Sequence, residues 1–70
     1  MKRTLQDFCK DNNTSFDKVI DLFYESCMKS NQYDMWKNAE IFVAYYKIET
    51  NETKKVYEAL MDRFEYKCIV

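Results

Sequence analysis

The chain has 70 residues, a formal net charge of −1, and no histidine, glycine or proline. This length allows a single domain, spanning residues 1–70. Without histidine the chain lacks the usual base of nucleophilic catalysis and the usual Cys/His zinc ligands, so we expect no enzyme and no structural zinc. Acids and bases are interspersed, which predicts no strongly basic face for nucleic acid.

The cysteines Cys9, Cys27 and Cys68 are odd in number and widely spaced. This pattern argues against a disulfide framework and against secretion. The N-terminus lacks the apolar run of a signal peptide, and no stretch is long enough to span a bilayer. We therefore expect a cytoplasmic protein with no cofactor, no metal and no membrane contact.

Turns in this chain must be made without glycine or proline. Only Asn and Asp remain to supply positive φ in tight hairpins, which disfavours a sheet and favours helices. Clusters of Asn, Ser and Thr at residues 12–15, 30–32 and 50–53 divide the chain into four segments. The fold class predicted is all-α: a compact bundle of three to four short helices joined by Asn/Ser/Thr loops.

The first segment, residues 4–11, predicts a short helix. Thr4 is followed three residues later by Asp7, close to a capping box, and Leu5, Phe8 and Cys9 share one face.

The second segment has the clearest helical period. We expect the helix to start at Thr14, with Asp17 at the third position. Its apolar residues fall within a narrow arc at 100° per residue, and they are Phe16, Val19, Ile20, Phe23 and Cys27.

The third segment, residues 34–48, is apolar on two sides, which predicts a central helix or one at an interface. One face carries Met35, Trp36, Ala39, Phe42, Val43 and Tyr46, and the second strip is Ile41, Ala44, Tyr45 and Ile48. Because residues 41–48 are nearly all good strand formers, a strand there is the alternative.

The fourth segment, residues 52–67, predicts a helix with Asn51 as its cap. Its stripe consists of Val56, Tyr57, Leu60, Met61, Phe64 and Cys68.

Two rows of carboxylates are candidates for binding a basic partner surface. They recur at helical spacing, as Asp17, Asp21 and Glu25 in the second segment and Glu58, Asp62 and Glu65 in the fourth. The simpler interpretation is a solvated face, partly neutralised by nearby lysines. A metal site built from these carboxylates is disfavoured.

Aromatic residues are abundant, with six tyrosines, five phenylalanines and Trp36. Tyr and Trp are enriched at protein interfaces, and a bundle this small cannot bury them all. Trp36 and the strip of Ile41, Tyr45 and Ile48 are therefore candidate partner-binding residues.

The hairpin of the first two helices resembles the spacing of a helix-turn-helix motif over about twenty residues. Cys9 occupies the position at which the motif usually has a small residue, and Asn13 occupies the position at which it usually has glycine. In this alternative the DNA contacts would come from Lys2, Arg3, Ser15 and Lys18. The acidic residues of the second helix would oppose docking onto phosphates.

These features favour a non-enzymatic protein-binding module that acts on a host or viral protein, and we expect it to form a homo-oligomer, a dimer. Lys, Asn, Tyr, Phe and Ile, whose codons are AT-rich, abound. This composition suggests a bacteriophage or mobile element as the source. A protein of that source could be an inhibitor or modulator of a host enzyme or defence complex, for example of anti-CRISPR type. The alternative is a helix-turn-helix regulator that reads DNA as a dimer.

Overall fold

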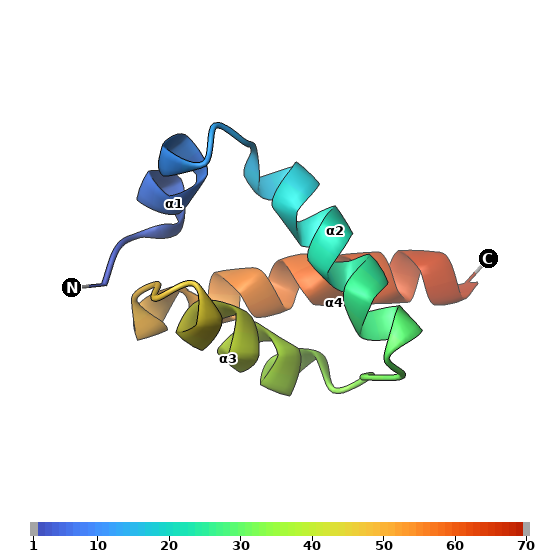
Figure 1. Cartoon of the computed structure of the whole chain (residues 1–70). Coiled ribbons are helices and arrows are strands. Elements are labelled where there is room, and N and C mark those ends of the chain that lie inside the picture. The colour runs from blue at the N-terminus through green and yellow to red at the C-terminus, as the bar shows by residue number, and fades with distance from the viewer. Residues whose placement is uncertain (1, 70) are drawn as a thin grey trace.

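The computed structural model describes the backbone of residues 2–69 and the side chains of residues 2–65. Its helices are α1 (Leu5–Asp11), α2 (Phe16–Lys29), α3 (Met35–Tyr45) and α4 (Thr53–Ile69), with a short 3₁₀ helix, η1 (Thr50–Glu52), leading into α4. The predicted all-α bundle is confirmed. Helices α3 and α4 run antiparallel side by side, while α2 crosses α4 and α1 lies near the start of α2 (Figure 1).

Three helices begin at a side-chain cap, as short polar residues at this position favour. The Thr4 hydroxyl accepts a hydrogen bond from the Asp7 N–H, as predicted. At α2 the cap is Ser15 rather than Thr14, because Ser15 holds the extended conformation and its hydroxyl accepts from the Lys18 N–H. Asp34 caps α3 in the same way.

The same helices end in left-handed residues without glycine. Asn13, Asn31 and Lys47 have φ values of 52°, 58° and 56°. In each case the next residue donates its N–H back into the last helical turn, as Thr14 does to the Cys9 carbonyl at 3.0 Å. This pairing is the Schellman motif, which reverses the chain sharply and satisfies carbonyls that the helix leaves free.

The alternative strand at residues 41–48 is wrong. The chain is helical to Tyr45 and then turns at Lys47, so that Ile48 donates its N–H to the Val43 carbonyl at 2.9 Å. Ile48 makes only an isolated parallel bridge with Arg3. The Glu49 N–H donates to the Arg3 carbonyl at 2.9 Å, which ties the N-terminal segment to the loop after α3.

The expected cap at Asn51 is also wrong, because Asn51 lies inside η1, which has no side-chain cap. The side chain of the neighbouring Glu52 instead forms a hydrogen bond with another helix, α1. Its carboxylate accepts a hydrogen bond from the Leu5 N–H at 2.6 Å, at the start of α1. A carboxylate there satisfies a free amide and is favoured by the helix dipole.

The core is a single cluster contributed by all four α-helices and the loop after α3. Its buried members are Leu5, Phe8, Ile20, Tyr24, Met35, Ala39, Phe42, Val43, Ile48, Val56 and Leu60. Phe42 lies within it, with ring centroids 5.0 Å from Phe23 and 4.9 Å from Tyr46.

Several predicted core residues are only half-buried. Phe16, Val19 and Phe23 of α2 pack against the cluster from its edge, whereas Tyr24 is 3% exposed. The predicted core position of Cys68 lies outside the residues whose side chains are described. Among the described residues, no helix has the length and apolar character needed to cross a bilayer.

Asn38 is a buried polar residue at 2% exposure. Its amide nitrogen donates to the Gln32 carbonyl at 2.9 Å, which fixes the loop between α2 and α3 from the side of α3. A buried amide needs such a partner, because desolvation without one is costly.

Candidate partner-binding surface

The exposed apolar strip of α3 consists of Ile41 and Tyr45, one helical turn apart. Ile41 is 47% exposed and Tyr45 is 73% exposed. The predicted third member, Ile48, is wrong as a surface residue, because it is 0% exposed and belongs to the core. The turn at Lys47 ends the helix and directs the chain inward, so helical spacing does not extend to Ile48.

A shallow groove adjoins this strip. It has a volume of about 420 Å³ and is lined by Phe8, Asn12, Thr14, Val19, Leu22, Phe23, Ser26 and Tyr46. Tyr46 connects the two features, since its ring centroid lies 4.9 Å from that of Tyr45. On the α2 side stands Leu22, which is 67% exposed. We call Leu22, Ile41, Tyr45 and Tyr46, together with this groove, the α2–α3 surface.

Trp36 belongs to a different region. At 100° per residue it lies 140° around α3 from Ile41. It is 45% exposed and packs edge-on against Tyr57 of α4, with ring centroids 5.1 Å apart. The structure therefore does not bring Trp36 together with the Ile41 strip.

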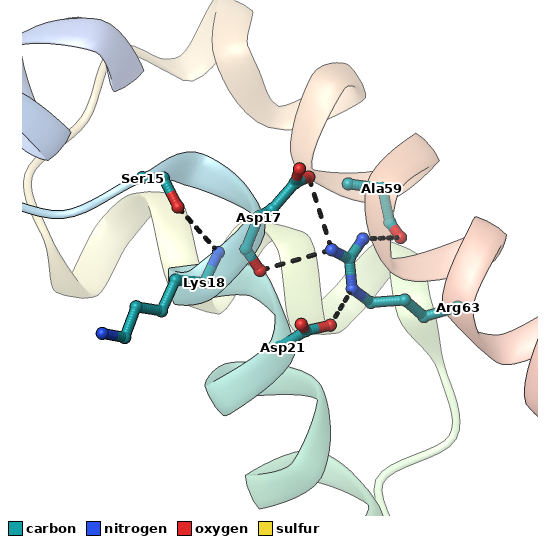
Figure 2. A network of polar contacts seen from close by, with 6 residues as sticks. All are labelled: Ser15, Asp17, Lys18, Asp21, Ala59 and Arg63. Carbon is teal, nitrogen blue, oxygen red and sulfur yellow. Dashed lines mark hydrogen bonds and ion pairs between the residues drawn. The ribbon is translucent and has the colours of Figure 1, made fainter.

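The acidic row of α2 is engaged by a residue of α4. Figure 2 shows the Arg63 guanidinium between Asp17 and Asp21, forming ion pairs at 3.5 Å and 2.5 Å. The same guanidinium donates to the backbone carbonyls of Ala59 at 3.2 Å and Asp17 at 3.3 Å. The contacts with Asp17 and Asp21 join α2 to α4, whereas the Ala59 contact lies within α4.

Arg63 is much less exposed than its partners. Its side chain is 16% exposed, against 88% for Asp17 and 61% for Asp21. Burial alone lowers the pKa of Arg63, but the hydrogen bonds and charges of Asp21 and Asp17 outweigh burial and raise the pKa above its usual value. Asp17 and Asp21 of the predicted row are therefore exposed, but each already forms an ion pair with Arg63 of the same chain.

The remaining predicted carboxylates lie on the surface. They are Glu25 on α2 and Glu58, Asp62 and Glu65 on α4, and all are exposed. A solvated acidic face accounts for them as well as a basic partner does.

The helix-turn-helix alternative has one structural feature in its favour and several against. Asn13 adopts the left-handed conformation that this turn requires. Ser15 is occupied as the cap of α2, and only Lys18 stands exposed beside it. Arg3 pairs with Asp11 at 3.0 Å and lies over the Phe8 ring, so that its charge is partly engaged within the molecule. Lys2 is exposed.

No group of potential metal ligands of the kind a cation needs occurs among the described residues. Cys9 and Cys27 are free thiols, and burial raises the pKa of both. A raised pKa lowers the thiolate fraction, so neither thiol is an activated nucleophile.

Sequence patterns miss three of these surface and positioning residues. Leu22 falls between the predicted core positions of α2 and gives no signal of its own. Arg63 and Glu52 act on helices that are distant along the chain, with contacts spanning 42 and 47 residues. Only the fold brings such pairs together.

Searches against protein-family models, curated proteins and solved structures return no match for this chain.

Proposed function

We propose that this chain is a non-enzymatic protein-binding module that docks a partner protein through the α2–α3 surface. The observation that carries the proposal is the exposure of large apolar side chains at one groove: Leu22, 67% exposed, lines it, and Tyr45, 73% exposed, contacts Tyr46 at its edge. Contiguous exposed apolar residues on a small protein mark interaction sites, because leaving them in water is unfavourable. Tyrosine beside an apolar groove is typical of an interface hot spot.

Energetics support this choice of surface. Covering apolar area contributes roughly 25 cal/mol per Å², so burial of two or three large side chains can supply a useful part of a binding free energy. The residues that line the groove carry no formal charge, so an apolar partner side chain entering it meets no unpaired ion. The proposed partner is a host or viral protein. Inhibition of a bacterial defence or host enzyme rests only on the amino-acid composition, which is rich in residues whose codons are AT-rich.

The proposal includes a homodimer through the same strip, which the partner protein would replace, because both occupy one surface. A two-fold interface needs a surface that is complementary to itself, with a projecting side chain and a hollow side by side. Leu22 and Tyr45 project next to the groove that Tyr46 lines. Sedimentation velocity tests this part, with a dimer expected at micromolar concentration and a monomer at all concentrations contradicting it.

Affinity capture from bacterial lysate, with and without nuclease, tests the main proposal. The tagged chain is compared with a double variant, Ile41→Ser with Tyr45→Ser, and a matched control, Lys10→Ser with Lys29→Ser, which changes exposed residues elsewhere. We expect a stoichiometric protein that survives nuclease and is lost only in the double variant, whose fold is checked by circular dichroism. Equal capture by all three proteins contradicts the proposal, and nucleic acid that vanishes with nuclease favours the DNA-binding alternative.

A further inference from the structure

The segment before α1 joins two elements that meet at the groove of the α2–α3 surface. The Arg3 N–H donates to the Lys47 carbonyl at 3.2 Å, and the Glu49 N–H donates to the Arg3 carbonyl at 2.9 Å. These two bonds form an isolated parallel bridge. Because α1 follows two residues later, the bridge holds the start of α1 beside the turn that ends α3 (Figure 1).

The Arg3 side chain contacts the two aromatic residues that line the groove from α1 and from the end of α3. Its guanidinium carbon lies 5.0 Å from the centroid of the Phe8 ring, and one guanidinium nitrogen donates to the Tyr46 carbonyl at 3.4 Å. Another guanidinium nitrogen forms an ion pair with Asp11, at the end of α1, at 3.0 Å. Three contacts fix the orientation of this planar group, since its donors are rigidly spaced.

Phe8 and Tyr46 also contact each other. Their ring centroids lie 4.6 Å apart, and both residues line the groove. A cation over an aromatic face is attracted to the ring, and a hydrogen bond to a carbonyl holds the backbone. A guanidinium that contacts the ring of Phe8 and the backbone of Tyr46 therefore limits how far α1 and the end of α3 can separate. Tyr46 in turn contacts the exposed Tyr45, with ring centroids 4.9 Å apart.

We propose that Arg3 is a positioning residue of the α2–α3 surface, because its guanidinium holds Phe8 and Tyr46 in the arrangement that gives the groove its shape. Arg3 is not among the described residues that line the groove, so it acts through these two. The inference rests on the proposed function, since it names what shapes the site at which the partner docks. A DNA contact by Arg3 would require the guanidinium to leave both aromatic residues.

Substitution of Arg3 separates the side chain from the bridge. Both bonds of the bridge use backbone atoms of residue 3, so Arg3→Gln can keep the bridge while it loses the cation and the ion pair. Arg3→Lys keeps a cation for the Phe8 ring but loses the planar group that contacts three partners at once. Lys2→Gln removes the neighbouring exposed charge and is the matched control.

Proton NMR of the aromatic rings tests the positioning role. In the parent chain, a cross-relaxation peak between the Phe8 and Tyr46 rings is expected from their separation of 4.6 Å. Arg3→Gln is expected to weaken this peak and to shift both ring signals, Arg3→Lys to shift them less, and Lys2→Gln to match the parent chain. The Trp36 ring, which packs against α4, is expected to stay in place. Unchanged Phe8 and Tyr46 rings in Arg3→Gln, or equal shifts at Trp36, would overturn the inference.

Docking is measured on the same variants. Sedimentation velocity is expected to give a dimer dissociation constant about tenfold higher for Arg3→Gln than for the parent chain, with a smaller rise for Arg3→Lys and none for Lys2→Gln. A parent chain that neither dimerises nor captures a partner contradicts the proposed function, whereas the ring signals still decide whether Arg3 positions Phe8 and Tyr46. Where the parent chain does dimerise, an equal dissociation constant for Arg3→Gln overturns the inference.

Discussion

Lys47 holds a left-handed conformation, at φ 56°, where α3 ends. A side chain with a Cβ is disfavoured there, and asparagine at the two equivalent turns tolerates it better than lysine does. Replacing Lys47 by glycine is therefore expected to raise the free energy of unfolding by about 1 kcal/mol.

Chemical denaturation measures this change. Lys37→Gly removes another exposed lysine, this one within α3, and is the control, with an expected loss of about 1 kcal/mol. A Lys47→Gly variant that is less stable than the parent chain would show that the left-handed turn is wrongly placed.

Arg63 joins α2 to α4 through two carboxylates and one backbone carbonyl of α2, and it also donates to the Ala59 carbonyl of its own helix. Exposed ion pairs contribute little, but this guanidinium is mostly buried and its hydrogen bonds to carbonyls are not screened in the same way. We expect Arg63→Gln to lower the free energy of unfolding by about 1 kcal/mol, and Asp17→Asn to lower it less. Denaturation in low and high salt checks both, and equal losses in the two variants would contradict this ranking.

Cys27 predicts a dependence of stability on alkaline pH. Burial raises the pKa of its thiol above the ordinary value of 9.0, so the folded chain keeps the proton at a pH where the unfolded chain has lost it. The thiol's contribution is full below the unfolded pKa and decreases as pH rises through the folded pKa.

A variant isolates this contribution from the lysines and tyrosines that titrate nearby. The difference in unfolding free energy between the parent chain and Cys27→Ala is expected to be constant below pH 9.0 and to shrink above it. A difference that stays constant into the alkaline range would mean that the thiol ionises freely in the folded chain.

At the scale of elements, α1 depends on a distant carboxylate. With seven residues α1 is too short to be stable alone, and the Glu52 carboxylate accepts the Leu5 N–H at its start. Glu52→Ala is expected to speed amide hydrogen exchange in α1 several-fold while the α3 amides change little. Uniform acceleration across all helices would show that Glu52 acts on global stability rather than on α1.

Local signals predicted most of these elements, because they depend on neighbours in sequence. Thr4 as a cap and the apolar period of α2 are examples, and both need only a few consecutive residues. Helix ends were less accurate: Ser15 rather than Thr14 caps α2, and a 3₁₀ turn replaces the cap at Asn51. Adjacent Thr and Ser residues compete as caps, and the tertiary position of the chain decides between them.

At the scale of the whole molecule, the candidate surface was predicted only in part. The exposure of Ile41 and Tyr45 was expected from the second apolar strip of α3, and it is confirmed. Ile48 was wrongly predicted to be exposed because helical spacing was extended past residue 46. The turn there is made by Lys47, and without a glycine the sequence gives no sign of it. Leu22 and the groove beside Tyr46 arise from how α1, α2 and α3 meet, which no single helical period encodes.

The shape of the molecule fits this account of its surface. The chain is elongated, with extents of 38 × 21 × 18 Å, so its accessible surface is large relative to the volume of its core. A folded chain of this mass has roughly 4,700 Å² of accessible surface, and this one has 5151 Å². Docking a second protein on the α2–α3 surface would remove apolar area from water that the core has no room to bury.

Photo-cross-linking at position 45 is the most direct test of that docking. A photoreactive phenylalanine analogue replaces Tyr45 in one sample and Lys10, an exposed residue outside the strip, in another. After irradiation in bacterial lysate, we predict a discrete cross-linked protein product from position 45 and none from position 10. Absence of any protein product at position 45, or the same product from both positions, would contradict a partner-binding surface between α2 and α3.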